Sequence, residues 1–205
     1  MNTKRIIILD DHTLFLKGIA LFLKTYSTKY DLYIYQSISK LKKDKLDFNE
    51  FDLLISDIDM PGEDTFELFE SLKTKYPKFP ILVISMHKKT IIINKCKELN
   101  IEGYLLKNEE EQLKTAVETI LKGGEYYSKT IQEFYAQIKN TQNILSSREE
   151  EIIKLIAEGY NNQEISEKTN ITIETVKTHK KNIKTKLKIS TPHEMVTFVK
   201  QNFIL

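Results

Sequence analysis

The chain has 205 residues, enough for one large domain or two small ones, and its 40% apolar and 29% charged residues exclude a disordered or fibrous protein. Its net charge of +2 is unevenly spread, because residues 1–127 carry 19 Lys and Arg against 20 Asp and Glu, whereas residues 128–205 carry 12 against 9. The short apolar runs, the lack of a signal-peptide pattern and the single cysteine, Cys96, argue against a membrane span, secretion and an internal disulfide. We therefore expect a cytoplasmic protein that does not bind a membrane. Its basic C-terminal part should bind an anionic partner.

Residues 1–127 alternate between short apolar runs and segments with apolar residues at helical spacing. The runs are rich in Ile, Leu, Val and Tyr, as strands are. A β-α unit repeated five times predicts an α/β fold, namely a doubly wound, five-stranded parallel sheet covered on both faces, with strand order 2-1-3-4-5. The predicted strands are residues 5–9, 31–35, 51–56, 80–85 and 103–106, and the predicted helices include residues 14–24, 66–76, 90–99 and 109–122.

Strand-like runs stop at Gly123-Gly124, which marks a change of architecture. Residues 128–143 are polar and mixed, with a short helix predicted near 131–138, and we interpret them as a linker. From residue 144 onward every pattern is helical. We therefore predict three parts: a first domain at 1–127, the linker at 128–143, and a second, smaller all-α domain at 144–205.

The helices of the second domain carry recognisable start and stop signals. Ser146 and Glu149 have the spacing of a capping box, and Gly159 marks the end of the helix that they open. Thr172 can cap a later helix, and Pro192 suits the first turn of the last one. The predicted helices cover about 146–158, 162–168, 172–188 and 192–202.

Acidic residues follow two strands that should be neighbours in the sheet. Asp10 and Asp11 come directly after the first predicted strand, and Asp57 follows the third. Because ligand sites of open parallel sheets form at the carboxyl ends of the strands, we expect the three carboxylates to share one pocket. Like charges this close need a cation, and a set of oxygen donors favours Mg²⁺.

Two further polar residues stand at the same edge of the sheet. Ser85 ends the fourth predicted strand, and Lys107 follows the fifth. A carboxylate, a metal, an ammonium and a hydroxyl together suit phosphoryl transfer, in which Asp57 would be the nucleophile. Taken singly, each residue could equally cap a helix or lie in solvent, and only their joint placement at four strand ends favours a functional site.

Four stretches of residues 1–125 resemble, in order and separation, the receiver domain of response regulators, which has a flavodoxin-like fold. They are Ile7-Ile8-Leu9-Asp10-Asp11-His12, Asp57-Ile58-Asp59-Met60-Pro61-Gly62, Ser85, and Gly103-Tyr104-Leu105-Leu106-Lys107-Asn108. The resemblance implies that a histidine kinase phosphorylates the chain, that a hydroxyl then moves to the phosphoryl group, and that an aromatic residue rotates inward. The residues it assigns are Asp57 as phosphoacceptor, Lys107 and Ser85 as phosphate partners, Tyr104 as switch, and Asp10, Asp11, Asp57 and the backbone carbonyl of Asp59 as Mg²⁺ ligands.

Two features depart from the common receiver pattern. Met86 follows Ser85, where the family usually has a small residue, and we expect it to narrow access to Asp57. Asn100-Ile101-Glu102 replaces an approach to the fifth strand that is usually rich in Ala and Gly. The sequence therefore leaves open a degenerate receiver, in which case the chain would be a phosphorylation-independent DNA-binding regulator.

Residues 172–188 form a predicted helix with one apolar stripe and one basic face. Ile173, Val176, Ile183 and Leu187 recur at helical spacing and should be buried. A helix fits the DNA major groove, where lysines contact phosphates, Asn can pair with adenine and Thr can meet thymine methyl groups. This helix contains no arginine, the residue that pairs with guanine through two hydrogen bonds, so we expect a preference for A·T-rich sites. The candidate DNA-binding residues are Lys177, Thr178, Lys180, Lys181, Asn182, Lys184 and Lys188.

Residues 144–205 also resemble the LuxR-type helix-turn-helix DNA-binding domain. The resemblance rests on Ser147-Arg148-Glu149, Gly159-Tyr160-Asn161-Asn162-Gln163-Glu164-Ile165, and the run from Thr175 to Leu187. Joined to a receiver, such a domain gives the NarL/FixJ architecture. The resemblance implies dimeric binding to paired half-sites, with residues 192–202 as the contact between copies. Pro192 stands where the family often has Arg, so one contact with the DNA backbone is expected to be missing.

We interpret the chain as a transcriptional response regulator in which phosphorylation of Asp57 controls dimerisation and promoter binding. It is then no enzyme in the usual sense, although it takes part in its own phosphotransfer and dephosphorylation. Its partners would be a histidine kinase, double-stranded promoter DNA and a second copy of itself on DNA, and RNA polymerase is a further candidate. An alternative is a haloacid-dehalogenase-like phosphatase, because Asp57-Ile58-Asp59 resembles the nucleophile motif of that family. The acidic pair before Asp57 and the basic C-terminal tail disfavour this alternative.

Overall fold

The computed structural model describes residues 3–27, 29–142 and 145–202. The chain forms two compact units, Met1–Lys88 with Lys95–Gln132, and Lys89–Asn94 with Glu133–Leu205. No helix among the described residues is long and apolar enough to cross a membrane.

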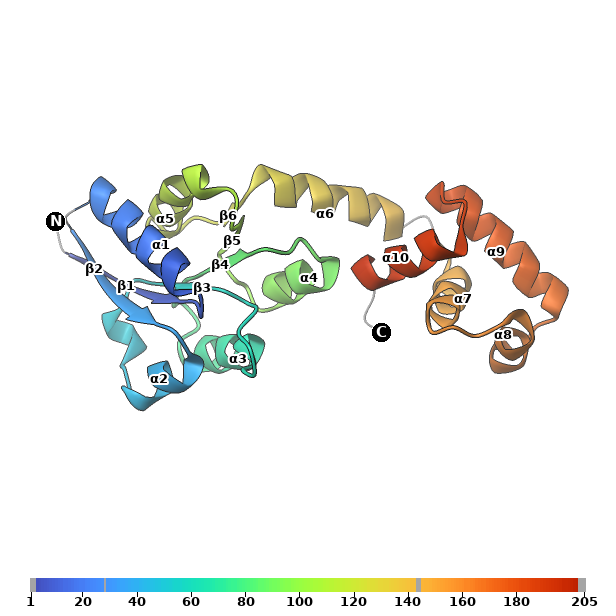
Figure 1. Cartoon of the computed structure of the whole chain (residues 1–205), viewed down its shortest axis with the longest axis horizontal. Helices are drawn as coiled ribbons and strands as arrows, with labels where there is room; N and C mark the ends of the chain where they lie inside the picture. Colours follow the sequence, from blue (N-terminus) through green and yellow to red (C-terminus); the bar gives the residue numbers. More distant parts are fainter. Residues whose placement is uncertain (1–2, 28, 143–144, 203–205) are drawn as a thin grey trace. The chain divides into compact units, whose positions relative to one another are not determined.

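The first unit contains a six-stranded, all-parallel sheet in the order β2-β1-β3-β4-β5-β6, with helices packed on it (Figure 1). The predicted order of the first five strands is confirmed, but the predicted number of strands is wrong. The sixth strand has two residues, too few to show a periodic pattern in the sequence. The strands are β1 Lys4–Leu9, β2 Tyr30–Tyr35, β3 Leu53–Ser56, β4 Ile81–Ser85, β5 Gly103–Leu106 and β6 Tyr126–Tyr127.

The helices and turns between these strands follow the βα pattern. The helix that follows β2, α2, has six residues and is shorter than the helices on either side of it. The helices are α1 Thr13–Tyr26, α2 Ile38–Lys43, α3 Thr65–Lys75, α4 Thr90–Glu98 and α5 Leu113–Leu121, and two 3₁₀ turns lie at Phe48–Glu50 and Glu110–Gln112.

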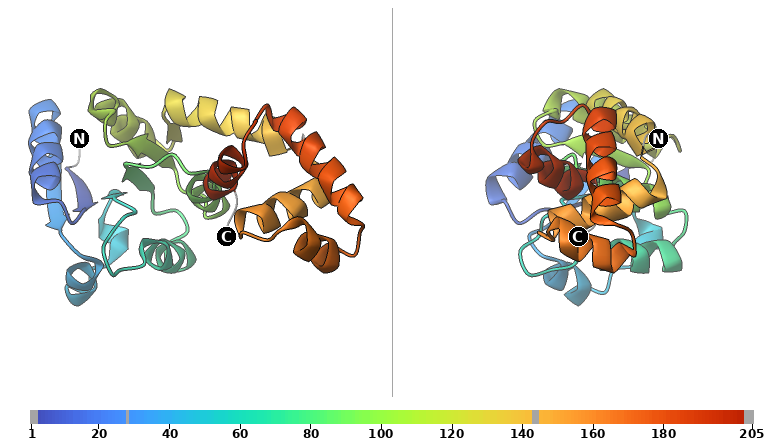
Figure 2. Two further views of the ribbon diagram at one scale, coloured as in Figure 1. Left: turned by 45° about the vertical axis from the view of Figure 1, so that its right-hand side comes forward. Right: turned by 90° about the vertical axis from the view of Figure 1, so that its right-hand side faces the viewer.

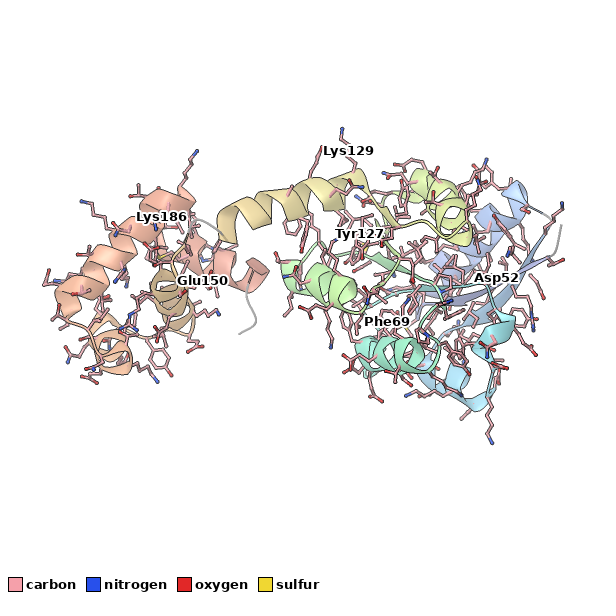
Figure 3. All side chains as sticks on the ribbon, turned by 180° about the vertical axis from the view of Figure 1, so that it is seen from behind. Asp52, Phe69, Tyr127, Lys129, Glu150 and Lys186 are labelled. Carbon is pink, nitrogen blue, oxygen red and sulfur yellow. The ribbon has the colours of Figure 1, made fainter. Side chains whose placement is uncertain are left out.

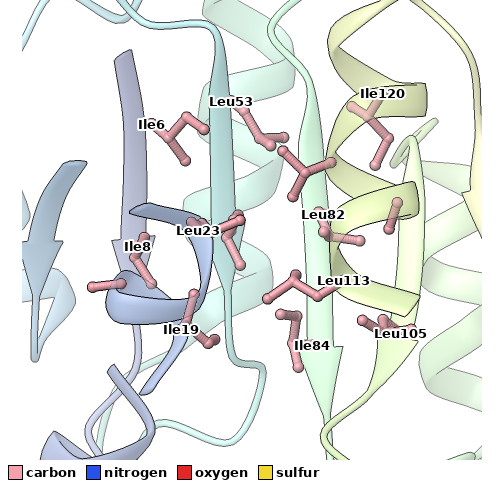
Figure 4. Close-up of a cluster of buried hydrophobic side chains, with 14 of the residues drawn as sticks. Ile6, Ile8, Ile19, Leu23, Leu53, Leu82, Ile84, Leu105, Leu113 and Ile120 are labelled. Carbon is pink, nitrogen blue, oxygen red and sulfur yellow. The ribbon is translucent and has the colours of Figure 1, made fainter. Parts of the chain in front are cut away.

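The central strands are buried on both faces. Ile6 and Ile8 of β1 pack in one cluster with residues of α1 and α5, and Figure 4 labels Ile19 and Leu23 of α1 in it. Ile7, which points to the other face, is equally buried. Strands covered on both sides need continuous apolar runs, which explains the sequence of β1, β3 and β4.

The second unit holds helices α7 to α10 and the part of α6 that follows Gln132. Residues predicted to be a linker with a short helix form a 14-residue helix, α6. After it, α7 contacts α9 and α10, and α8 contacts α9; these are the orange to red helices in Figure 2. Their apolar core includes Ile152, Ile165, Val176, Ile183 and Val199. The bounds are α6 Lys129–Gln142, α7 Ser147–Ala157, α8 Asn162–Thr169, α9 Ile173–Leu187 and α10 Pro192–Asn202.

The predicted helix starts of this unit are present as hydrogen bonds. Ser146 and Glu149 form the capping box of α7, and Asn161 with Glu164 forms a second one at α8. The Thr172 side chain accepts a hydrogen bond from the backbone amide of the third helical residue of α9. These caps fix where α7, α8 and α9 begin and therefore how the helix-turn-helix is spaced.

Candidate functional site

The carboxyl ends of β1, β3 and β5 bring acidic and basic side chains together. Leu9 of β1 pairs with Ser56 of β3, so the residues that follow them, Asp10 and Asp57, are neighbours. Lys107, which follows β5, places its Nζ 2.6 Å from Asp10 Oδ2 and 2.7 Å from Asp57 Oδ2. The side chain of Asp10 is only 3% exposed, that of Asp57 2% and that of Lys107 8%. We call Asp10, Asp11, Asp57 and Lys107 the acid pocket.

Burial and pairing work against each other on the titratable groups of the acid pocket. Burial raises the pKa of Asp57, and the hydrogen bond and charge of Lys107 offset only part of this rise. Burial alone would lower the pKa of Lys107, but its hydrogen bonds to Asp10 and Asp57 outweigh burial and raise it. The second oxygen of Asp57, Oδ1, accepts hydrogen bonds from the amides of Ile58 and Asp59, at 2.7 and 3.2 Å. The Asp57 carboxylate is therefore held at both oxygens.

Asp11 has an oxygen with one polar neighbour. Its Oδ1 is buried and, apart from His12 Nδ1 at 2.9 Å, has no polar partner within the part of the chain that the structure describes. One donor atom from each of Asp10, Asp11, His12 and Asp57 lies within 4.8 Å of the others. Three carboxylates against one ammonium leave an excess of negative charge on oxygen donors, which fits a divalent ion such as Mg²⁺. Asp59 meets the pocket differently, because its exposed side chain points toward Ser85 and His87, at 3.5 Å each.

Ser85 and Tyr104 lie on the β4 and β5 side of the pocket. Both side chains are fully buried. Ser85 Oγ accepts a hydrogen bond from the amide of His87 at 3.1 Å, and the Tyr104 hydroxyl donates to the carbonyl of His87 at 2.6 Å. Burial raises the pKa of Tyr104 far above its usual value. Tyr104 thus points inward and fastens β5 to the segment after β4.

The two departures from the receiver pattern have different surroundings. Met86 is 69% exposed, so its side chain extends into solvent. Glu102 stands before β5, at the opposite end of the strands, where its carboxylate accepts hydrogen bonds from Lys73 at 2.6 Å and from the amide of Ile81 at 2.9 Å. The expectation that Met86 narrows access to Asp57 stays a prediction.

The α9 helix divides its polar residues between solvent and the fold. Lys177, Lys181 and Lys188 are exposed, as are Thr178 and Asn182, and Lys184 is half-buried. Val176 and Ile183, predicted as core, are fully buried, whereas Ile173 and Leu187 are half-buried. We call the exposed face that carries Lys177, Thr178, Lys181, Asn182, Lys184 and Lys188 the basic face.

Two lysines of α9 are held by other helices. The Lys180 ammonium donates to Asn162 Oδ1 of α8 at 2.8 Å, and burial, followed by the charge of Lys184, lowers its pKa. Lys186, labelled in Figure 3, donates to the buried carboxylate of Glu149 at 2.7 Å. The guanidinium of Arg148 donates to the carbonyl of Thr169 at the end of α8. These contacts tie α7, α8 and α9 together and fix the orientation of the basic face.

Sequence reasoning did not single out several residues that now stand at the sites. His12 lies beside the acid pair, with Nδ1 3.1 Å from Asp10 Oδ1 and 2.9 Å from Asp11 Oδ1. His87 and Asn162 hold site residues through contacts that join distant segments. His12 has a signal in the sequence, because it directly follows two carboxylates, and Asn162 lies in the stretch that resembles the LuxR-type domain, whereas His87 has no such signal.

The chain matches two protein families in sequence. Residues 6–118 match response regulator receiver domains, and residues 143–199 match the luxR family of bacterial regulatory proteins. The oxygen regulatory protein NreC of Staphylococcus aureus is 31% identical, over 98% of this chain and 99% of NreC. These matches extend over both units of the chain.

Solved structures of RcsB are similar to the whole chain. One of the Salmonella typhimurium RcsB response regulator, studied for its conformational dynamism for DNA interaction, has a TM-score of 0.78 at 27% identity and covers 96% of this chain and 99% of RcsB. Another, of two RcsB dimers bound to two parallel DNAs, has a TM-score of 0.74 at 28% identity, over 98% and 99% of the two chains.

Proposed function

Because this chain belongs to the response regulators that join a receiver to a LuxR-type DNA-binding domain, and is a two-component transcription regulator, we propose that Asp57 is its phosphoacceptor. A histidine kinase donates the phosphoryl group, and phosphorylation controls dimerisation and promoter binding. The observation that carries the proposal is the buried Asp57 carboxylate, which lies 2.7 Å from Lys107 and within 4.8 Å of donor atoms of Asp10 and Asp11. The proposed domains are a receiver at 1–127, a linker at 128–143 and a DNA-binding domain at 144–205.

The residues of the acid pocket suit transfer from phosphohistidine to a carboxylate. An Asp57 oxygen bonds to phosphorus while the N–P bond breaks, and the bonding electron pair stays on the histidine nitrogen of the kinase. Lys107 neutralises charge on the phosphoryl oxygens. Asp10, Asp11, Asp57 and the backbone carbonyl of Asp59 would hold Mg²⁺, which supplies further neutralisation when bound. The chain thereby takes part in its own phosphotransfer and, with water as the second acceptor, in its own dephosphorylation.

Ser85 and Tyr104 would carry the change of charge away from the pocket. Ser85 donates a hydrogen bond to the phosphoryl group in place of its present contacts. Tyr104 is bonded to the carbonyl of His87, so a shift of the segment after β4 alters the environment of both residues. A local charge change would then bias two arrangements of the surface formed by β4, β5 and their helices.

The proposed readout is DNA binding through α9. Lys177, Lys181, Lys184 and Lys188 contact phosphates, and Thr178 and Asn182 reach base edges. Lys180, predicted as a further phosphate contact, would first have to leave Asn162. The related RcsB binds DNA as dimers, which supports a homodimer of this chain on promoter DNA. Such a regulator works where the chromosome is, in the cytoplasm, and RNA polymerase is a candidate partner there.

Labelling with acetyl phosphate and Mg²⁺ tests the phosphoacceptor. The native chain should gain one phosphoryl group, measured by intact-protein mass, and Asp57→Asn should gain none. Asp59→Asn is the matched control, because it removes a neighbouring carboxylate and keeps the backbone carbonyl. Full labelling of the Asp57→Asn variant would refute the assignment. Continued release of inorganic phosphate over many turnovers from an aryl phosphate would instead favour the phosphatase alternative.

A further inference from the structure

An imidazole nitrogen lies beside two carboxylates of the acid pocket. His12 follows the acidic pair and is the residue before α1, and its ring Nδ1 points toward Asp10 and Asp11 although the rest of the side chain is exposed. The backbone amide of His12 also donates to Asp10 Oδ1 at 2.8 Å, which fixes the start of the side chain. The imidazole is therefore held at the rim of the pocket by the same turn that presents the two carboxylates.

The spacing of the donor atoms matches that around one small dication. Octahedral ligation with bonds of about 2.1 Å places neighbouring donors about 3.0 Å apart and opposite donors about 4.2 Å apart. His12 Nδ1 lies 3.1 Å from Asp10 Oδ1 and 2.9 Å from Asp11 Oδ1, and the whole donor set spans at most 4.8 Å. Small side-chain movements would bring all four donors onto one ion.

Lys107 contacts different carboxylate oxygens from His12. Its Nζ lies beside Asp10 Oδ2 and Asp57 Oδ2, whereas His12 Nδ1 lies beside Asp10 Oδ1 and Asp11 Oδ1. Apart from His12 Nδ1 at 2.9 Å, Asp11 Oδ1 has no polar partner among the described residues. Buried carboxylate oxygens need a counterion, so a dication shared by Asp11 and His12 would stabilise the pocket.

The nature of the donors decides which cation is preferred. Oxygen donors alone suit Mg²⁺, whereas an imidazole nitrogen adds affinity for first-row transition metals, in the order Mn²⁺ < Co²⁺ < Ni²⁺. We propose that His12 Nδ1 is a metal ligand of the acid pocket and makes this pocket prefer a transition-metal dication to Mg²⁺. The inference rests on the proposed function, because the same pocket must hold a divalent cation.

Metal binding to the full-length chain tests the ligand directly. The probes are Mg²⁺ and Ni²⁺, titrated by calorimetry, and Mn²⁺, whose electron spin resonance detects a directly bound nitrogen through its hyperfine coupling. The native chain should show this coupling. His12→Asn should lose it and bind Ni²⁺ at least about tenfold more weakly, since even a partner one shell further out is worth that much. Its affinity for Mg²⁺ should change less than twofold.

His87→Asn is the matched control, because His87 is the other imidazole at the rim and lies 3.5 Å from Asp59. It should leave the nitrogen coupling and the Ni²⁺ affinity as in the native chain. Asn is a favoured residue before a helix, so His12→Asn should keep the fold, which circular dichroism checks. Should that variant fail to fold, the presence or absence of the coupling in the native chain decides the question.

Each other outcome has one meaning. An unchanged Ni²⁺ affinity and no nitrogen coupling would mean that His12 only donates a hydrogen bond to Asp10, and the inference is then wrong. Asp11→Asn should weaken binding of both Mg²⁺ and Ni²⁺. If Asp11→Asn changes neither, the metal pocket of the proposed function fails as well, and the two failures are thereby told apart.

Discussion

The acid pocket and the basic face handle charge in opposite ways. In the pocket, Lys107 is bound on both sides by carboxylates and is almost entirely buried. On the basic face, the Lys181 ammonium is exposed and has no partner among the described residues. Buried charges must be satisfied within the fold, whereas exposed ones remain available to a ligand. The comparison predicts that substitutions in the pocket change stability, and that substitutions on the basic face change DNA binding alone.

Lys107→Met should give the largest loss of stability. It leaves Asp10 and Asp57 buried without their cation, which costs about 3 kcal/mol of unfolding free energy at pH 7. Burial already raises the pKa of Asp57, and losing the hydrogen bond and charge of Lys107 should raise it further, so the deficit should shrink as the pH falls and Asp57 is protonated. Urea unfolding of the receiver, followed at pH 7 and at pH 5, measures both the loss of stability and its dependence on pH. Lys114→Met, which removes a half-exposed lysine, should change less than about 0.5 kcal/mol.

Glu149→Gln should destabilise the C-terminal helices by about 1 kcal/mol, because the variant loses a charged cap and weakens the Lys186 contact. Burial raises the pKa of Glu149, but hydrogen bonds from Lys186 and Ser146 outweigh it and lower the pKa below the ordinary value. The native contribution is therefore present above the unfolded pKa and is lost as the pH falls through the folded one. Between pH 7 and pH 4, the melting temperature of the variant should therefore depend less on pH than that of the native chain. Equal slopes for Glu149→Gln and the exposed control Glu158→Gln would contradict this account.

Lys181→Ala and Lys186→Ala sharpen the comparison within one helix. Lys181→Ala should keep the melting temperature and reduce the slope of log affinity for DNA against log salt by about 1. Lys186→Ala should lower the melting temperature, because it leaves the buried Glu149 carboxylate without its cation, and should keep the salt slope at temperatures where it is folded. If the two variants exchange these effects, the division of the lysines between face and fold is wrong.

Glu174→Gln should give the smallest effect. Glu174 Oε1 lies 2.6 Å from Lys177 Nζ in an exposed pair, and such pairs contribute about 0.2–1 kcal/mol. Removing the carboxylate releases the Lys177 ammonium from its ion pair and removes one negative charge that lies beside the basic face. DNA affinity, measured by fluorescence anisotropy at low salt, should rise slightly, and the melting temperature should fall only by the small amount that one exposed pair contributes.

Much of the pocket can be predicted because strand ends follow from apolar runs. The runs before Asp10, Asp57 and Lys107 place these residues at one edge of a parallel sheet, and their contacts follow from strand order. The direction of the His12 ring cannot be predicted in this way, because it depends on a side-chain rotamer at the start of α1. The short β6 also escapes prediction, since two tyrosines carry no periodic signal.

The basic face is harder to predict than the buried side of the same helix. Helical spacing correctly identifies Val176 and Ile183 as core. The same spacing gives Lys180 and Lys186 an angle on the helix, but their partners Asn162 and Glu149 belong to other helices. Which lysines remain free therefore depends on tertiary packing, which a single-helix pattern does not contain.

The central claim is that a phosphoryl group on Asp57 changes how α9 binds DNA. The most direct test compares the affinity of the native chain and of Asp57→Asn for a duplex selected from a random-sequence pool, with and without acetyl phosphate and Mg²⁺. We predict tighter binding of the native chain after phosphorylation and no response of the variant. A labelled native chain that binds the duplex as it did before labelling would contradict the claim and favour the phosphorylation-independent regulator.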